Sequence, residues 1–222
     1  KFGLPKPMVP IDGRPFLEYL LIMLKKKGFT DFIFCTHHQA EKIKDYFKDG
    51  SKFEVKISYS HEDKPLLSAG ALKLAESMLE NDFFVINGDD YFPLDFKEMF
   101  DLHKEKNSLI TISGKNWKGE YEGKYASFFS NENGVVEEYY HKDGKKLREP
   151  NHAFFACFLI NKSVIKTLPK DIPLSLEKDV LPEVVKTQRV YSYNTKATFS
   201  EIGTPEKYEE FIEDVKSRVI NL

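Results

Sequence analysis

The sequence predicts an α/β domain of three layers, in which helices cover both faces of a mainly parallel central sheet. Strand-like and helix-like segments alternate between residues 16 and 90. The strand-like segments 31–36 and 83–87 are continuous apolar runs, which are typical of strands buried on both faces. Beyond residue 108 the strand-like segments follow one another through short connections, which indicates antiparallel hairpins. The expected fold is therefore Rossmann-like, with an added antiparallel portion.

The first half of the chain predicts three helices that alternate with three strands. Pro15 suits the first position of a helix, and Gly28 suits the residue past its end. Asp49-Gly50 is a turn pair, and Ser68 can cap the helix that follows it. In order, these elements are a helix over 16–24, a strand over 31–36, a helix over 39–48, a strand over 53–60, a helix over 68–79 and a strand over 83–87.

The second half predicts the antiparallel portion and then further helices. Asn133-Gly134 is a favoured two-residue hairpin turn. No repeat, low-complexity stretch or Gly/Ser linker interrupts residues 1–222, so one domain is expected. The strand over 83–87 should lie between helical layers and not at a solvated edge. The remaining strands are expected over 108–113, 125–130, 134–140 and 153–160, and the remaining helices over 162–168, 176–186 and 205–219.

Composition and charge exclude several classes of protein. The 222 residues are 41% hydrophobic and 31% charged, as in an ordinary globular chain. The formal net charge of −2 argues against a nucleic-acid-binding protein, which needs a basic excess. No run approaches the ~20 apolar residues of a membrane span, and no apolar signal segment opens the chain, so a cytoplasmic protein without membrane contact is expected. Cys35 and Cys157 lie in apolar runs and are expected to be buried, reduced thiols.

Four segments carry residues that suit phosphate chemistry. The first is Leu4-Pro5-Lys6-Pro7-Met8, in which two prolines restrict the backbone around Lys6. A lysine that is presented so rigidly suits an anionic group. The alternative is a solvated lysine in a surface loop.

The second segment is Asn87-Gly88-Asp89-Asp90, which follows the apolar strand 83–87 directly. Ligands of open parallel sheets bind beyond the carboxyl ends of the strands, and Gly88 leaves room beside the Asp89 carboxylate. Hard cations such as Mg²⁺ take carboxylate oxygens and share them with substrate phosphates. The alternative is a simple strand-ending turn, where Gly and Asp are common.

The other two segments lie at predicted helix starts. Thr204 and Pro205 suit the N-cap and the first position of the last helix. Glu201, just before them, could supply a second carboxylate or be incidental. The loop from Glu62 to Gly70 places small residues before a helix, where backbone N–H groups can meet a base or a phosphate.

Together and in order, these segments resemble the sugar-1-phosphate nucleotidyltransferases over nearly the whole chain. That family includes the mannose- and heptose-1-phosphate guanylyltransferases and the muramate-1-phosphate uridylyltransferase. Each match alone is weak, whereas the ordered set is specific. The resemblance rests on Pro5 to Ile11, Pro15 to Tyr19, Leu66 to Leu72, Asn87 to Asp89, Val136 to Lys142, Ser175 to Glu177 and Glu201 to Pro205.

The resemblance implies the nucleotidyltransferase fold and its reaction. An NTP and a sugar 1-phosphate would give an NDP-sugar and pyrophosphate, for glycan or cell-surface polysaccharide synthesis, with Mg²⁺ as the cofactor. The implied metal ligands are Asp89 and Glu201. The implied catalytic residues are Lys6, Asp89 and Lys142. The implied nucleotide-binding residues are Lys6, Glu62, Leu66, Ser68, Gly70 and Gly88, and the implied sugar-binding residues are Asn87, Ala126, Lys142 and Glu177.

The sequence also departs from the family pattern. The family's Gly-Gly-x-Gly-Thr-Arg nucleotide loop is expected just before Lys1 and is not in this sequence. Either the native start precedes Lys1, or the first strand and the triphosphate cradle are lacking. The other departures are single residues: Glu201 for the usual aspartate, Leu67 for the glycine of a Leu-Gly-Thr step, Ala126 for the glycine of a Tyr-Gly step, and His141 for the glutamate before Lys142.

Two other functions stay open. A non-catalytic relative that binds a nucleotide-sugar and regulates an active enzyme would explain the missing loop and Glu201. A nucleotide-sugar-dependent glycosyltransferase would also use a carboxylate after a buried strand, but the Pro-Lys-Pro and Gly-Thr-Pro segments argue against it. The base and the sugar are open too, with a slight preference for GTP and for heptose or mannose. The sequence leaves the oligomeric state undecided, a homo-oligomer included.

Overall fold

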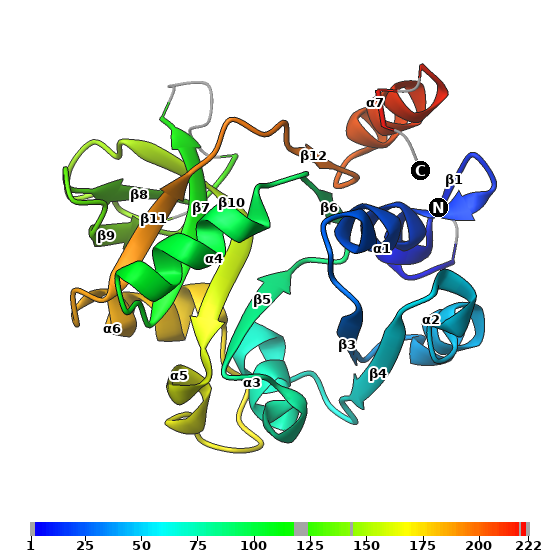
Figure 1. Cartoon of the computed structure of the whole chain (residues 1–222), viewed down its shortest axis with the longest axis horizontal. Coiled ribbons are helices and arrows are strands. Elements are labelled where there is room, and N and C mark those ends of the chain that lie inside the picture. The colour runs from blue at the N-terminus through cyan, green and yellow to red at the C-terminus, as the bar shows by residue number, and fades with distance from the viewer. Residues whose placement is uncertain (1–2, 118–123, 143, 218, 221–222) are drawn as a thin grey trace. The chain divides into compact units, whose positions relative to one another are not determined.

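The computed structural model describes residues 3–117, 124–142, 144–217 and 219–220, and its elements form two compact units (Figure 1). The first unit comprises Lys1–Asp63, Asn87–Leu94 and Ala197–Leu222. The second unit comprises Lys64–Ile86 and Asp95–Lys196.

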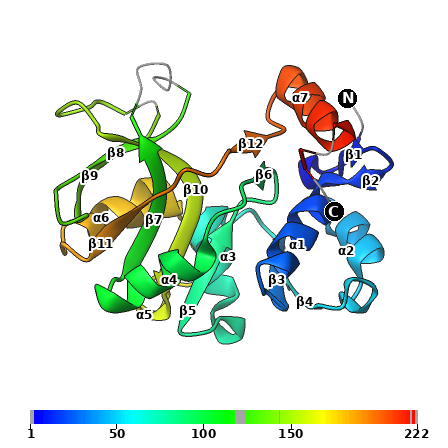
Figure 2. The ribbon, with the colours of Figure 1, turned by 45° about the horizontal axis from the view of Figure 1, so that its top comes forward.

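Among its described residues, the first unit combines three α-helices with three pairs of strands. β3 and β4 pair in parallel, whereas β1–β2 and β6–β12 pair antiparallel, the latter visible in Figure 2. Its helices are α1 (Phe16–Lys26), α2 (Ala40–Phe47) and α7 (Pro205–Lys216), with 3₁₀ turns at Lys6–Met8 and Ser51–Phe53. Its strands are β1 (Pro10–Ile11), β2 (Arg14–Pro15), β3 (Asp31–Thr36), β4 (Lys56–His61), β6 (Asp90–Tyr91) and β12 (Ser200–Glu201).

An aromatic cluster joins α7 and β6 to α1. Phe211 of α7 is only 1% exposed. Its ring centroid lies 4.8 Å from that of Phe16, 5.9 Å from that of Tyr19 and 5.5 Å from that of Tyr91. Tyr91 follows Asp90 in β6, and α7 begins soon after β12. The cluster therefore fixes the two strands that carry candidate site residues.

The second unit is organised around a six-stranded sheet. The strand order is β11-β7-β10-β8-β9, and β5 pairs with the C-terminal half of β10. The β7–β11 pair is parallel and the others are antiparallel. The strands are β5 (Asp82–Ile86), β7 (Ile110–Asn116), β8 (Ser127–Ser130), β9 (Val136–Tyr140), β10 (His152–Asn161) and β11 (Val190–Asn194). The helices are α3 (Leu67–Leu74), α4 (Phe96–Glu105), α5 (Lys162–Lys166) and α6 (Leu181–Val185), with a 3₁₀ turn at Glu76–Met78 and a π-helix at Leu176–Val180.

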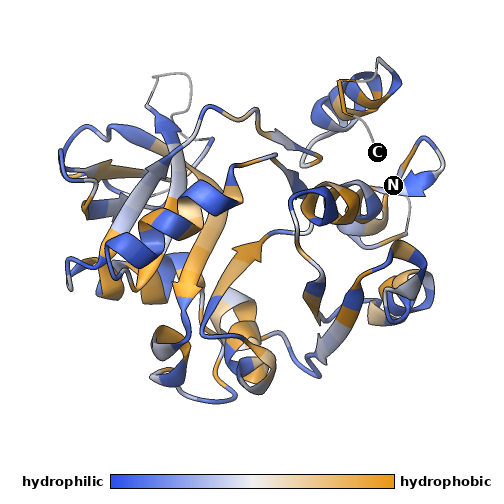
Figure 3. Cartoon of the chain, viewed as in Figure 1, coloured by the Kyte–Doolittle hydropathy of each residue, from blue (hydrophilic) through white to orange (hydrophobic). Residues whose placement is uncertain are grey.

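The centre of this sheet is the apolar strand β10, which pairs with β5, β7 and β8. β5 and β10 are coloured as hydrophobic along most of their length in Figure 3. Cys157, Leu159 and Ile160 of β10 are completely buried, as is Ile110 of the neighbouring β7. The predicted α/β class and the antiparallel second half are therefore confirmed, in a sheet of mixed direction.

The expected environment of the 83–87 strand is corrected. The sequence predicts that it joins 31–36 and 53–60 in one parallel sheet between helices. Instead, β5 pairs antiparallel with β10, its one partner among the described strands, and each of its five residues is partly exposed. An apolar run indicates that the side chains of a strand pack against other elements, but it carries no information about the direction of the neighbouring strand.

Three local expectations are also corrected. The helix predicted over 68–79 ends at Leu74. Ser68 lies inside α3 and does not cap it, because Leu66 occupies the cap position. Both cysteines are free thiols, but only Cys157 is buried. Cys35 is exposed because β3 is covered along little of its length, Thr36 being its one buried residue.

The expected end of α1 and the expected start of α7 are confirmed, whereas Pro15 is the N-cap of α1 in extended conformation and not its first helical residue. Gly28 follows the end of α1 with a φ of +95°, a backbone conformation that glycine adopts without strain. The Thr204 side chain caps α7 by accepting a hydrogen bond from the Lys207 N–H, with Pro205 next to it. In the described part of the chain, no helix has both the length and the apolar character needed to cross a bilayer.

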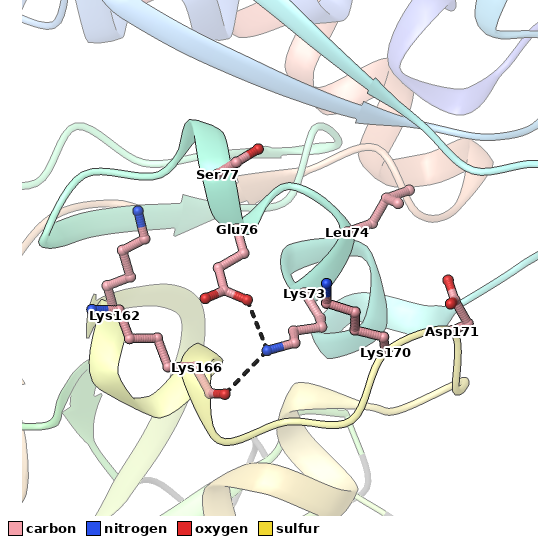
Figure 4. A pocket seen from close by; sticks show the side chains of 8 residues that line it. All are labelled: Lys73, Leu74, Glu76, Ser77, Lys162, Lys166, Lys170 and Asp171. Carbon is pink, nitrogen blue, oxygen red and sulfur yellow. Dashed lines mark hydrogen bonds and ion pairs between the residues drawn. The ribbon is translucent and has the colours of Figure 1, made fainter.

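Lys73 connects α3 to α5 inside a pocket of 460 Å³ (Figure 4). Its side chain is 6% exposed and forms an ion pair with Glu76 at 2.7 Å. Its Nζ also donates to the carbonyl oxygens of Ile165 and Lys166 at the end of α5, both at 3.1 Å. Such terminal carbonyls have no partner within their helix, so the lysine serves as a structural junction. The pocket lining contains none of the predicted site residues: it is Lys73, Leu74, Glu76, Ser77, Lys162, Lys166, Lys170 and Asp171.

The ionisation of Asp82 in β5 makes the free energy of unfolding depend on pH in the acidic range. Burial raises its pKa, but hydrogen bonds from Lys104 (2.8 Å) and Asn161 (2.7 Å) outweigh burial and lower it overall, helped by the nearby His103. A lowered pKa stabilises the fold above the unfolded value of ~3.9, and this stabilisation is lost as the pH falls through the folded value. Urea unfolding at pH 6, 4 and 3 should therefore show that wild type exceeds Asp82→Asn in free energy of unfolding at pH 6, and that this margin narrows as the pH falls. A margin that does not change with pH would contradict this.

Candidate functional site

Two distant segments of the first unit meet at Lys6 and Asp89. Lys6 begins the 3₁₀ turn Lys6–Met8, directly after Pro5 in extended conformation. Its ammonium group forms an ion pair with the Asp89 carboxylate, from the turn that follows β5. An ideal Cβ on Gly88 would lie 3.2 Å from Cγ of Pro7, so glycine allows the two segments to approach this closely. Lys6, Gly88 and Asp89 are thus brought together in the first unit.

Asp90 and Asn87 form the buried side of the same turn. Asp90 is 6% exposed and accepts a hydrogen bond of 2.9 Å from the Asn87 amide. Burial, and next the negative charge of Asp89, raise the pKa of Asp90 to about 7. This carboxyl group is therefore partly protonated at neutral pH, which makes it a weaker ligand for a cation than a fully ionised neighbour. Asn87, which the resemblance assigns to the sugar, is engaged in holding Asp90.

Glu201 lies beside this turn because β12 pairs with β6. In that pairing Glu201 is opposite Asp90. The Glu201 carboxylate forms an ion pair with Lys207 from the first turn of α7. Lys207 could not be found from the sequence, because a lysine six residues from a glutamate across a helix start gives no pattern of its own. Each of the two predicted metal ligands, Asp89 and Glu201, therefore has a lysine as its partner.

The donor set suits Mg²⁺. Mg²⁺ is usually held by one or two carboxylates together with substrate phosphates, and not by an all-protein cage. Asp89 and Glu201 provide two carboxylates from neighbouring segments. Among the described residues no group of three or more His, Cys, Asp or Glu side chains is arranged to hold a metal ion. Asp89 and Glu201 are therefore the two carboxylates that would hold such a cation together with a phosphate.

The absence of a side chain at Gly203 leaves room for the Glu201 carboxylate. An ideal Cβ on Gly203 would lie 2.6 Å from Oε2 of Glu201 and 3.7 Å from Nζ of Lys6. Gly203→Ala should displace the carboxylate and lower kcat by about tenfold, with little loss of folding stability, because the side chain that moves is partly exposed. Steady-state kinetics and thermal unfolding measure the two effects. The control is Ser200→Ala in β12, which should keep kcat within twofold. Another glycine such as Gly13 is not a suitable control, because its φ is positive and alanine there would strain the backbone.

The predicted base-binding residues Leu66, Ser68 and Gly70 lie in the second unit, on and before α3. The Ser68 hydroxyl accepts a hydrogen bond of 2.8 Å from the Leu176 N–H. An ideal Cβ on Gly70 would lie 2.8 Å from the Ile172 carbonyl oxygen, so α3 is braced against the segment before the π-helix. Glu62 belongs to the first unit and is buried; its N–H donates to the Thr36 carbonyl.

Three of the four predicted sugar-binding residues, Ala126, Lys142 and Glu177, are also in the second unit, whereas Asn87 is in the first. Glu177 lies in the π-helix Leu176–Val180 and accepts a hydrogen bond of 2.6 Å from the Tyr139 hydroxyl. Burial, and next the Glu177 charge, raise the pKa of Tyr139, so it stays a hydroxyl donor. Ala126 is buried just before β8, and its carbonyl accepts from the Phe154 N–H. Lys142 is exposed and, in the part of the chain that the structure describes, has no hydrogen-bond or ion-pair partner.

The predicted residues thus fall into two groups. The first unit brings together Lys6, Asn87, Gly88, Asp89 and Glu201 and also contains Glu62. The second unit contains Leu66, Ser68, Gly70, Ala126, Lys142 and Glu177. In the second group, Tyr139 could not be found from the sequence, because a tyrosine in an alternating strand is indistinguishable from a core residue.

Comparisons with known proteins agree with this chemistry. The Nucleotidyl transferase family model (NTP_transferase) matches residues 2–218. D-glycero-alpha-D-manno-heptose 1-phosphate guanylyltransferase of Aneurinibacillus thermoaerophilus is 31% identical over 212 residues, which cover 93% of this chain and 87% of that protein. UTP–glucose-1-phosphate uridylyltransferase of Synechocystis sp. is 30% identical over 230 residues, which cover 98% of this chain but 59% of that protein.

Solved structures give the same result. HddC from Yersinia pseudotuberculosis has a TM-score of 0.81 at 30% identity, over 96% of this chain and 90% of HddC. The structure of HddC complexed with GMP-PN has a TM-score of 0.79 at 29% identity, over the same shares of both chains. The chain therefore belongs to the nucleotidyl transferase family, among the sugar-1-phosphate nucleotidyltransferases.

Proposed function

We propose that the protein transfers GMP from GTP to a heptose or mannose 1-phosphate, giving a GDP-sugar and pyrophosphate. The observation that carries the proposal is the Lys6–Asp89 pair, in which residues 83 positions apart place a cation and an anion side by side. Nucleotidyl transfer needs both: positive charge for the phosphates and a carboxylate for the metal ion that accompanies them. Support for guanine and for heptose comes from the named activity of the Aneurinibacillus relative and from the GMP-PN complex of HddC.

The chemistry requires positioning and charge neutralisation more than proton transfer. A phosphate monoester has a second pKa of about 6, so the attacking oxygen of the sugar phosphate is already an anion at neutral pH and needs no general base. It attacks the α-phosphorus in line with the leaving pyrophosphate. The protein must hold these two anions in contact, which is unfavourable without compensating positive charge.

Each group of residues has a part in this task. Lys6 neutralises the nucleotide phosphates, and Lys142 neutralises the sugar phosphate. Asp89 and Glu201 would hold Mg²⁺, which when bound supplies positive charge to the reacting phosphates. Glu177, oriented by the Tyr139 hydroxyl at 2.6 Å, accepts hydrogen bonds from sugar hydroxyls. Backbone groups of the 66–70 loop meet the base.

In the free protein the two lysines keep the two carboxylates compensated. The Lys6 side chain is 45% exposed and that of Asp89 is 27% exposed, so the pair can separate without opening the core. When substrates bind, the ammonium group of Lys6 can turn to phosphate while Asp89 turns to the cation. The same exchange is open to Lys207 and Glu201, whose side chains are 32% and 22% exposed.

We also propose that the protein acts in the cytoplasm, as a supplier of sugar donors for glycan or cell-surface polysaccharide synthesis. The free thiols of Cys35 and Cys157 suit a reducing compartment.

The test is a substrate panel on the complete gene product. Each of GTP, UTP, ATP, CTP and dTTP is combined with heptose, mannose and glucose 1-phosphates, and pyrophosphate release is measured with mass identification of the sugar product. The proposal expects the highest kcat/KM for GTP with heptose or mannose 1-phosphate. Consumption of an NDP-sugar without pyrophosphate release would indicate a glycosyltransferase. Nucleotide-sugar binding with no turnover of any pair would indicate the non-catalytic alternative.

A further inference from the structure

Leu67 has a backbone conformation that leucine rarely adopts. Its φ is +59°, in the left-handed region that favours glycine. Among the described non-glycine residues with positive φ, it is the only apolar one; the others are Asp12, Gln39, Lys48, Glu54, Asn107, Asp171 and Gln188. The leucine side chain is also 55% exposed. Leu67 thus combines backbone strain with apolar surface in water, and neither stabilises the free protein.

The neighbouring segment holds Leu67 in this conformation. The Leu66 carbonyl accepts a hydrogen bond of 2.9 Å from the Leu174 N–H. The Leu174 carbonyl in turn accepts from the N–H groups of Ala69 (2.8 Å) and Gly70 (3.2 Å). Residues on both sides of Leu67 are therefore attached to Leu174, while the Leu67 side chain stays more than half exposed.

The strained backbone and exposed side chain of Leu67 suit the binding of a flat apolar ligand. A strained conformation persists where the surroundings impose it, and such positions cluster at ligand-binding sites. An exposed apolar side chain that is held rigidly loses little conformational entropy when a flat apolar surface covers it. Leu67 lies in the 66–70 loop, where the proposed function places the nucleobase. A purine covers more of a leucine side chain than a pyrimidine does, because its ring system is larger.

We propose that the Leu67 side chain packs against the face of the nucleobase and favours purine over pyrimidine nucleotides. This inference rests on the proposed function, since it takes the 66–70 loop as the place where the base binds. It assigns base selection in this protein to a side chain at a position where the sequence pattern of the family has glycine. The leucine is then a specificity-determining residue, and it takes no part in phosphate transfer.

The test uses Leu67→Gly with Leu67→Met as its conservative partner. Leu67→Gly should raise the Kd and the KM of GTP roughly fivefold, as expected for the loss of about half a buried leucine side chain, and those of UTP by less. The ratio of GTP to UTP kcat/KM should therefore fall, while kcat with saturating GTP stays within twofold. Leu67→Gly should also melt at the same or a higher temperature, because glycine accepts a φ of +59° without strain. Leu67→Met should keep the GTP to UTP ratio of wild type.

A matched control comes from the same helix. Leu74 of α3 is 41% exposed and has no positive φ, and Leu74→Ala should leave all nucleotide constants unchanged. An unchanged GTP to UTP ratio in Leu67→Gly, with wild type active, would overturn the inference and leave the proposed function intact. If Leu67→Gly weakens GTP binding as expected but wild type turns over no sugar phosphate, the proposed function alone would be overturned. Wild type that binds no nucleotide would overturn both.

Discussion

Asp89→Asn is expected to lower kcat by about a hundredfold or more. Asparagine keeps the shape of the turn after β5 but removes the negative charge that pairs with Lys6. The cation site would lose one of its two charged ligands, and Lys6 would lose the partner that positions it. Pyrophosphate release with both substrates saturating measures kcat. Calorimetric titration of Mg²⁺ in the presence of nucleotide separates the loss of metal affinity from the loss of turnover.

Two aspartates provide comparisons for that variant. Asp45 is exposed on α2 in the same unit, so Asp45→Asn should leave kcat within twofold. Asp90→Asn should be milder than Asp89→Asn, because the Asp90 carboxyl group is buried and already partly protonated at neutral pH. Normal turnover by a folded Asp89→Asn protein would remove the metal-site assignment and favour the non-catalytic alternative.

Phe211→Ala is expected to lower the free energy of unfolding by about 3–5 kcal/mol. The ring is 1% exposed and contacts three other aromatic rings, so alanine would leave a cavity that α1, β6 and α7 cannot fill without moving. Urea unfolding followed by circular dichroism measures the loss. Because α7 carries Lys207 and β6 carries Asp90, the surviving folded protein should also turn over more slowly.

The comparison for this prediction is a phenylalanine outside any such cluster. Phe100 of α4 is 37% exposed, and Phe100→Ala should cost about 1 kcal/mol or less. Phe211→Leu should fall between wild type and Phe211→Ala, because leucine fills part of the cavity. Equal losses for Phe211→Ala and Phe100→Ala would show that the aromatic cluster does not anchor α7.

The sequence predicts the elements of this fold better than their pairing. Most helices and strands lie within a few residues of their expected positions, because hydrophobic period, prolines and glycines act locally. β5 shows the limit: its apolar run was visible, but the antiparallel partner β10 is about 70 residues away and leaves no mark on the local pattern. The direction of a strand's neighbour is set by chain topology, which hydropathy does not encode.

The candidate site, too, was only partly predictable from local sequence. Lys6 and Asp89 could be found because prolines and a strand-ending glycine mark their positions. Lys207 and Tyr139 could not, because each is an ordinary surface lysine or strand tyrosine until a long-range contact gives it a partner. The unusual conformation of Leu67 was equally hidden, since no propensity scale assigns leucine to the left-handed region.

The two lysine–carboxylate pairs have a consequence for the order and synergy of ligand binding. A nucleotide that draws Lys6 to its phosphates leaves Asp89 uncompensated, and a cation that occupies Asp89 leaves Lys6 free for phosphate. Whichever ligand arrives first must disrupt the pair, and the second meets a partner already released. Nucleotide and Mg²⁺ should therefore enhance each other's affinity by the same factor, as thermodynamic reciprocity requires. The free protein would bind either one weakly and the two together tightly, so that the site is assembled only when both are present.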